Sequence, residues 1–412
     1  MINFSFKYLP LLVFTGIWGI VFYFYNLQLF NVHQATSETL AIFLFGILAF
    51  MSGYVLFTLY DVNSINTHQY DIVANISQPV LFYLVLALCM VTLTGAYLVI
   101  QTVINELGSF DAYFDTPVRV RNLFVDYQEN PLKPPPLTYK FGSYLVNIGF
   151  ASTLFGGVLL VTKGWRRWGG LLVIFVFTIA SFSTVGRYTL FNSLFFLFFS
   201  YLLAIFYTNE KLKKRRLIEL SAFTVLLIFF VGGITYFVIN IRSTLTSESA
   251  VIEYTLKTSY LYLTGGIPAF DKFLNQDFLF AHGGSSLRSV FRWLIKLGIW
   301  PEESLKTVHE SFVTVTPVIQ INTYTYMKSF FEDFGMSGVL IGSFIFGATC
   351  KLIHYSYLRR FTFIGLGLTL TFIFTAFMSF YSFYLHSITT IIYRLLFIWV
   401  IQVLLSKHLF KK

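Results

Sequence analysis

One arginine, Arg187, stands between two long apolar runs in the stretch ASFSTVGRYTLFNSLFF, residues 180–196. A guanidinium group is permanently charged, and its planar fork donates two parallel hydrogen bonds to paired oxygens such as those of a pyrophosphate. The short polar connection gives this side chain little reach into water, and a cation held at a lipid boundary costs about 3 kcal/mol. We therefore predict that Arg187 binds an anion; the structural alternative is an anchor in lipid headgroups.

Five further arginines are candidate ligands for the same anion: Arg119, Arg121, Arg242, Arg288 and Arg394. In TPVRVRNLF, Arg119 and Arg121 alternate with apolar residues, so an extended segment would direct both side chains to one side. Arg394 lies about two turns, roughly 9 Å, into the last apolar run. For Arg119 and Arg121 the structural alternative is a solvated loop face, and for Arg242 it is an interfacial anchor. For Arg394 it is an internal ion pair or a carbonyl cluster at a helix bend.

Residues that could accept a proton gather in one long polar connector. They are His282 in FAHGGSS, His309 and Glu310 in TVHES, and Glu332 and Asp333 in FFEDFG. A general base must lie near the hydroxyl that loses its proton, and both imidazole and carboxylate groups serve in this role. We predict Asp333 and His282 as the acceptors. The structural alternatives are a solvated histidine and an acid that stabilises the start of the next helix.

Motifs of soluble enzymes are absent from the sequence. It contains no phosphate-binding loop, GxGxxG, HExxH, GxSxG or cysteine–histidine metal pattern, so we expect no metal and no cofactor. The net charge of +10 does not predict nucleic-acid binding, because the cations lie between apolar runs. Cys89 and Cys350 both fall inside such runs and predict no disulfide.

The elements that must position these residues are membrane helices. Hydrophobic residues make up 56% of the chain and charged residues 12%, against about 25% charged in soluble domains. Many apolar runs exceed the length of about 18 residues that crosses the hydrocarbon layer. We predict an all-α polytopic membrane protein with one integral membrane domain over residues 1–412. The ten predicted spans are 9–30, 39–60, 79–104, 141–162, 169–185, 189–208, 217–240, 334–353, 362–385 and 388–406.

The orientation follows from lysine and arginine in the short loops. Four basic stretches, TKGWRRWGG, NEKLKKRR, YLRRF and SKHLFKK, fall on one side of the ten-span topology, whereas the connector at 61–78 carries no Lys or Arg. An inside N-terminus places these four stretches in the cytoplasm. It places two large loops, 105–140 and 241–333, outside. The Pro-rich part of ENPLKPPPLTYK in the first loop predicts an extended, non-helical segment.

The second large loop contains a basic amphipathic pattern over residues 286–298. Arg288, Arg292 and Lys296 recur every four residues and share one helical face. Leucine, valine and phenylalanine residues occupy the opposite face. We predict a short helix that lies flat among the outer headgroups.

Four stretches resemble the oligosaccharide repeat-unit polymerases of the Wzy type, which polymerise O-antigen and capsular polysaccharide. They are STVGRYTLFNSLF, YLTGGIPAFDKFL, HGGSSLRSVFRWLIKLG and INTYTYMKSFFEDFGMSGVLIGSFIFG. The resemblance covers the last half of the chain by motif and all of it by topology. One feature differs, because some members carry paired Arg-x10-Gly motifs that none of the loop arginines here matches. The roles of individual residues are therefore taken from their own chemistry.

The resemblance implies a metal-independent, GT-C-like membrane glycosyltransferase in the bacterial cytoplasmic (inner) membrane, with its active site facing outward or toward the periplasm. It would join repeat units carried on undecaprenyl pyrophosphate, with membrane lipids, a chain-length regulator and a flippase as further partners. In this hypothesis Arg187, with Arg394 or Arg242, binds the departing pyrophosphate. Tyr262 and Tyr324 would stack on sugars. A lipid-linked oligosaccharide flippase or transporter and an O-antigen ligase are the alternative functions.

Overall fold

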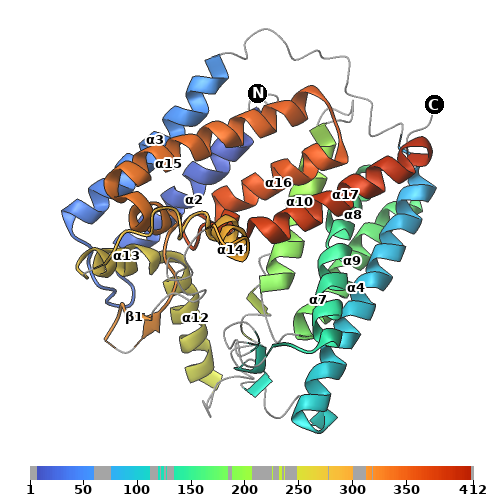
Figure 1. The fold of residues 1–412 in the computed structure, drawn as a ribbon, viewed down its shortest axis with the longest axis horizontal. Coiled ribbons are helices and arrows are strands. Elements are labelled where there is room, and N and C mark those ends of the chain that lie inside the picture. Colours follow the sequence, from blue (N-terminus) through green and yellow to red (C-terminus); the bar gives the residue numbers. More distant parts are fainter. Residues whose placement is uncertain are drawn as a thin grey trace. The chain divides into compact units, whose positions relative to one another are not determined.

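The chain forms two compact groups of helices, which we describe separately (Figure 1). The computed structural model describes residues 7–59, 76–111, 119–120, 122–124, 127, 134–183, 188–206, 225, 232–233, 236, 248–276, 278–299, 312–317 and 319–409. Unit 1 contains Met1–Asn66, Leu256–Arg360 and Leu368–Ile392. Unit 2 contains Thr67–Thr255, Phe361–Gly367 and Tyr393–Lys412.

Helices make up most of both units. Those of unit 1 are α2 (Leu9–Asn26), α3 (Ser37–Leu59), α13 (Gly266–Leu274), α14 (Arg288–Lys296), α15 (Tyr326–Arg359) and the 3-10 turn η5 (Tyr384–Ser387). Those of unit 2 are α4 (Gln78–Leu107), α7 (Leu137–Gly149), α8 (Ala151–Val161), η3 (Trp165–Trp168), α9 (Gly169–Ser183) and α10 (Tyr188–Phe206). Helices α12 (Glu248–Thr264), α16 (Phe363–Met378) and α17 (Ile388–Leu409) have residues in both units.

The prediction of a helical, membrane-embedded chain is confirmed at this level. Among the described residues, eight helical segments are long and apolar enough to cross a bilayer. They are Leu9–Asn26, Ser37–Thr58, Gln78–Leu107, Leu137–Val161, Trp165–Ser183, Tyr188–Ile205, Tyr326–Arg359 and Ile388–Leu405. The predicted span 217–240 lies almost wholly outside the described residues. One exception to the helical pattern is a short antiparallel ladder in which β1 (Val313–Thr314) pairs with β2 (Gln320–Ile321).

Helix α16 is shorter than the predicted span 362–385. It ends at Met378, and the next residue, Ser379, accepts hydrogen bonds from residues of other helices. The Ser379 carbonyl accepts a hydrogen bond from the Tyr326 N–H at 2.8 Å, and its hydroxyl accepts one from the Trp18 indole at 2.9 Å. These tertiary bonds direct the Ser379 carbonyl away from a continuing helical ladder, and periodicity in the sequence cannot show them.

Helices α3 and α15 cross in very close contact within unit 1 (Figure 1). A Cβ added to Gly53 would meet the carbonyl of Phe344, and one added to Gly347 would meet the carbonyl of Phe50. Attraction between helices in lipid comes from such close backbone packing, because lipid tails are as apolar as leucine. These two glycines therefore fix how α15 sits on α3.

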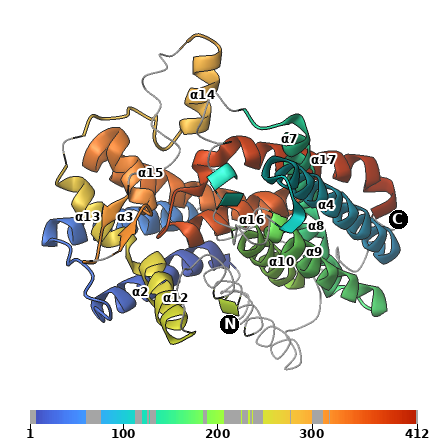
Figure 2. The ribbon, with the colours of Figure 1, turned by 90° about the horizontal axis from the view of Figure 1, so that it is seen from below.

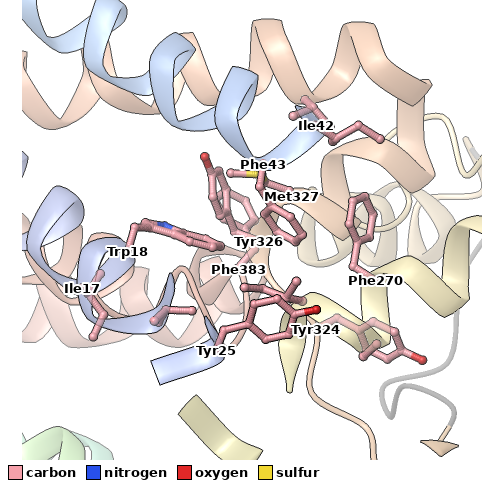
Figure 3. Close-up of a cluster of buried hydrophobic side chains, with 14 of the residues drawn as sticks. Ile17, Trp18, Tyr25, Ile42, Phe43, Phe270, Tyr324, Tyr326, Met327 and Phe383 are labelled. Atoms are coloured by element: carbon pink, nitrogen blue, oxygen red, sulfur yellow. The ribbon is translucent and has the colours of Figure 1, made fainter. Parts of the chain in front are cut away.

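Aromatic side chains fill the rest of the unit 1 core (Figure 3). Phe14 stacks on Phe50 with ring centroids 3.7 Å apart, and it meets the edge of Tyr326 at 5.9 Å. Trp18 packs against Phe43 at 5.4 Å. Since these rings come from α2, α3 and α15, the core holds the three helices together.

Unit 2 packs around α4, which contacts α7, α8 and α9. Gly95 of α4 and Gly142 of α7 approach so closely that a Cβ on either would lie 2.6–2.8 Å from the carbonyl of the other. The predicted span 141–162 is divided into α7 and α8 around Phe150. This division was not predicted, and Phe150 at its centre keeps helical dihedral angles.

Helix α15 also contains a break, at Phe334 and Gly335. Gly335 has φ +62° and ψ −148°, a conformation that is essentially restricted to glycine. The break separates a first limb, residues 326–333, from a long second limb, residues 336–359. The two carboxylates of FFEDFG therefore end the first limb instead of beginning a continuous membrane helix.

Candidate functional site

Charged side chains gather at the end of unit 1 that carries α13, α14 and the first limb of α15. We call the backbone stretch 281–286, AHGGSS, the strap, because it ties α14 to that limb. The Ala281 N–H donates to the Glu332 carbonyl at 2.8 Å. Figure 2 shows α14 projecting from the rest of unit 1, beyond the strap.

Asp333 is fully buried, and its carboxylate holds the strap in place. Its Oδ1 accepts the Ser285 N–H at 2.9 Å. Its Oδ2 accepts both the N–H and the hydroxyl of Ser286, at 2.8 and 2.5 Å. A carboxylate that satisfies buried N–H groups removes a desolvation cost of about 1–3 kcal/mol for each group. The described hydrogen bonds of Asp333 all go to the strap and none to the helix that follows.

Glu332 belongs to a buried charge pair beside this carboxylate. It accepts hydrogen bonds from the Ser285 hydroxyl at 2.9 Å and from the Lys328 ammonium at 3.3 Å. Lys328 also lies over two aromatic rings, 4.9 Å from the centroid of Phe273 and 4.8 Å from that of Tyr324. Both charges are almost fully buried. A buried pair of this kind is costly to break, because the remaining partner is left unpaired.

The strap itself presents His282. This residue is exposed and has φ +45°, and Gly283 follows it at φ +98°. A Cβ on Gly283 would lie 2.9 Å from the Phe291 ring, so a side chain there would also displace α14. The tight turn that these two residues make holds the imidazole at the surface of the charged cluster.

A second carboxylate of this end, Asp271 of α13, is bound by the connection between α2 and α3. Its Oδ1 accepts the N–H and hydroxyl of Thr36 at 2.7 and 2.8 Å and the hydroxyl of Thr39 at 2.7 Å. Its Oδ2 lies 2.8 Å from the His33 Nε2. The Asp271 side chain is 2% exposed and that of His33 is 39% exposed. The pair therefore joins a buried anion to a ring that reaches the surface.

Hydrogen bonding keeps Asp271 ionised. Burial alone would raise the pKa of Asp271, but the bonds from the Thr36 N–H, the Thr39 hydroxyl, His33 and the Thr36 hydroxyl together lower this pKa below its usual value. The donors lie at the start of α3, where the helix dipole also favours negative charge. Because an ionised carboxylate only accepts hydrogen bonds, the His33 Nε2 carries the proton.

Arg394 makes a different contact within unit 2. Its Nε and Nη2 both donate to the Asn147 Oδ1, at 3.2 and 2.9 Å. The Asn147 Nδ2 donates to the Ser143 carbonyl, which turns its oxygen toward the arginine. The guanidinium carbon lies 3.8 Å from the centroid of the Phe150 ring. Arg394 thus lies beside the junction between α7 and α8. Its partner there is a side-chain amide, whereas the structural alternative was an ion pair or a cluster of carbonyls at a helix bend.

The other predicted site residues are dispersed. Arg119 is exposed, and the Arg288 side chain is mostly buried at the start of α14. Tyr262 is half-buried, with its ring 5.9 Å from that of Tyr381, and Tyr324 is buried beneath Lys328. Arg187, Arg121, Arg242, His309 and Glu310 lie outside the described residues. The structure therefore brings together Asp333, His282 and Tyr324, with Glu332, and places Arg394 in the other unit.

Helix α14 falls within the predicted range 286–298, and several of its apolar side chains are exposed although Phe291 is buried. Trp293 is 58% exposed and Leu297 is 68% exposed, and Leu287 and Val290 are also exposed. On the basic face, Arg292 and Lys296 are exposed while Arg288 is not. This combination of exposed apolar and basic side chains is typical of a helix in the headgroup layer.

Sequence reasoning did not single out His33, Asp271 or Lys328. The partners His33 and Asp271 are 238 positions apart, whereas Lys328 pairs with Glu332 four positions later. One signal was present, since Lys328 and Glu332 have the i,i+4 spacing of an ion pair on one helical face. Among the described residues there is no group of three or more His, Cys, Asp or Glu side chains that could hold a metal ion.

Comparisons with protein-family models, with curated proteins and with solved structures find no match for this chain.

Proposed function

We propose that the protein is a membrane-embedded glycosyltransferase that joins oligosaccharide repeat units, carried on undecaprenyl pyrophosphate, into O-antigen or capsular polysaccharide. In this proposal it is a GT-C-like protein of the bacterial cytoplasmic membrane, and the charged end of unit 1 faces outward. The motif resemblance supports the reaction. The topology predicted from the basic loops supports the side.

The observation that carries this proposal is the attachment of a buried charged cluster to an exposed amphipathic helix. The strap links Asp333 and Glu332 to α14, on which apolar Trp293 and Leu297 are exposed together with Arg292 and Lys296. A lipid-linked glycan has an apolar tail, an anionic pyrophosphate and a polar sugar. It therefore fits a site where apolar, basic and hydrogen-bonding groups meet within one short segment.

The chemical roles follow from what the reaction requires. The departing pyrophosphate gains negative charge, which arginine stabilises through paired hydrogen bonds. In the proposal Arg187, with Arg394 or Arg242, provides this contact. The acceptor hydroxyl must lose a proton to a base. Both oxygens of Asp333 already accept hydrogen bonds from the strap, which favours a positioning role for Asp333.

Deletion of the gene in a producing bacterium tests the proposal. We expect single repeat units displayed outside the cell, and full-length polymer ladders once the wild-type chain is restored. Purified protein should then convert carrier-bound units extracted from the deletion strain into ladders and release undecaprenyl pyrophosphate. Units trapped inside the cell would instead indicate a flippase, and free polymer that is not joined to lipid A core would indicate a ligase.

A second experiment separates catalysis from a passive role of the cations. The variants Arg187→Lys and Arg187→Ala should each shorten or abolish the ladders at equal protein level, with the larger loss in alanine. Lysine keeps the charge but cannot donate the two parallel bonds. Normal ladders in both variants would remove Arg187 from the mechanism.

A further inference from the structure

We propose that His33 is a catalytic proton acceptor and that Asp271 is its positioning residue. This inference rests on the proposed function, because it assigns a residue to that reaction. It adds a site formed by the connection between α2 and α3, which contains none of the residues named from sequence. The argument depends on the geometry of the pair and on how firmly its backbone is held.

The first step concerns the orientation of the imidazole. Asp271 accepts a hydrogen bond from His33 Nε2 at 2.8 Å, so the other ring nitrogen, Nδ1, is the one that can receive a proton. The His33 side chain is 39% exposed, whereas Asp271 is 2% exposed. A buried carboxylate that fixes the tautomer of an accessible imidazole is the arrangement that activates histidine as a general base.

The second step concerns the backbone around the ring. The His33 N–H donates to the Val315 carbonyl at 2.8 Å, and the His33 carbonyl accepts from the Tyr25 hydroxyl at 3.3 Å. The same hydroxyl accepts the Ala35 N–H at 2.6 Å. The loop is therefore bonded to α2, to α13 and to the segment beside β1. Because these bonds already hold the base in place, no conformational entropy of the loop is lost when the reaction occurs.

The third step asks whether a purely structural latch explains the histidine. Three donors, from Thr36 and Thr39, already engage the Asp271 Oδ1 and hold the start of α3 to α13. His33 engages the other oxygen only and leaves much of its ring in solvent. An amide side chain would satisfy that oxygen equally well. Among the described residues the second ring nitrogen makes no hydrogen bond, and its presence is explained by proton transfer.

In the proposed step, the acceptor hydroxyl of one glycan forms a bond to the anomeric carbon of another, and that carbon loses its bond to the pyrophosphate oxygen. The hydroxyl proton passes to Nδ1 of His33, and the electron pair of the broken bond leaves with the pyrophosphate. The imidazolium is stabilised by Asp271 until it returns its proton to water. Asp271 of α13 and Tyr25 of α2 are the titratable groups that the described contacts place against His33.

The test uses the purified full-length chain and carrier-bound repeat units extracted from the deletion strain. The variant His33→Gln keeps an N–H donor for Asp271 but cannot accept a proton. We expect its turnover to fall about 100-fold or more with little change in KM. We also expect the wild type to lose activity toward acid pH, where a protonated imidazole cannot act as a base. The residual activity of the variant should lack this dependence.

Two further variants keep the inference falsifiable if His33→Gln is unstable. Asn31→Gly changes an exposed residue of the same loop at φ +49°, and it should leave turnover unchanged. Thr39→Val removes one bond to Asp271 without touching His33, and it should lower thermal stability but keep the pH profile. Turnover of His33→Gln equal to wild type overturns the inference, and so does a loss that only follows stability, as in Thr39→Val. Absence of polymer with the wild type instead contradicts the proposed function.

Discussion

The two buried aspartates at the charged end of unit 1, Asp271 and Asp333, perform a similar task with different partners. Asp333 binds the strap through Ser285 and Ser286, whose backbone and hydroxyl groups are themselves buried. Asp271 binds the start of α3 through one oxygen and an accessible imidazole through the other. A carboxylate whose oxygens both serve backbone groups can only hold a loop in place. One that shares an oxygen with an exposed histidine can also take part in proton transfer.

The largest expected effect is at Asp333. The variant Asp333→Ala leaves the buried N–H groups of Ser285 and Ser286 without an acceptor, so we expect a loss of about 3–5 kcal/mol in the free energy of unfolding. Protease cleavage within residues 281–286 should become faster as the strap detaches. Thermal unfolding in detergent and limited proteolysis measure both effects.

The matched control is Asp333→Asn, in which the amide oxygen still accepts one of these bonds. It should lose roughly half as much stability. If the alanine and asparagine variants both unfold like the wild type, then Asp333 does not hold the strap.

The effect at Asp271 should be smaller and should depend on pH. Because the pKa of Asp271 is lowered in the folded protein, its contribution to stability is complete above the ordinary aspartate value of about 3.9 and is lost as the pH falls through the lowered value. We expect Asp271→Asn to cost about 2 kcal/mol at neutral pH. The difference from wild type should shrink as the pH falls below about 4.

Thermal unfolding of both proteins across this pH range provides the measurement. A stability difference that stays constant down to pH 3 would show that the charge on Asp271 is not what the α3 donors stabilise.

The smallest effect should come from Ser286→Ala. This change removes the hydroxyl bond to the Asp333 Oδ2 but keeps the bond from the Ser286 N–H. We expect a loss of about 1 kcal/mol. Ser337→Ala is the control, since its hydroxyl bonds a carbonyl at an exposed position, and it should be close to neutral. An equal loss in both serine variants would contradict the special role assigned to the strap.

Much of the helical architecture could be predicted from the sequence because lipid imposes long apolar runs. Hydropathy alone located the helices that begin at Leu9, Gln78 and Tyr188. It could not locate the end of α16 at Met378 or the division between α7 and α8. The end of α16 coincides with tertiary contacts, the bonds from Trp18 and Tyr326 to Ser379.

The polar residues of the candidate site could be predicted from the sequence, but not the contacts between them. Glu332, Asp333 and the strap were all visible as polar residues in one connector, and the structure places them in contact. The structural alternative for Asp333, capping of the next helix, is replaced by bonds to the strap, because Gly335 breaks α15 just after it. The pairing of His33 with Asp271 could not be predicted, since it requires the connection between α2 and α3 to meet helix α13.

The tight crossing of Gly53 and Gly347 has a consequence for biogenesis. These glycines are separated by about 300 residues. At a synthesis rate of about 5–20 residues per second, α3 is therefore made about 15–60 s before the α15 segment that packs on it. During that interval the glycine groove of α3 must be occupied by lipid tails or by the insertion machinery. Unit 1 is therefore completed only when nearly the whole polypeptide has left the ribosome, and truncated chains should be recognised by quality-control proteases.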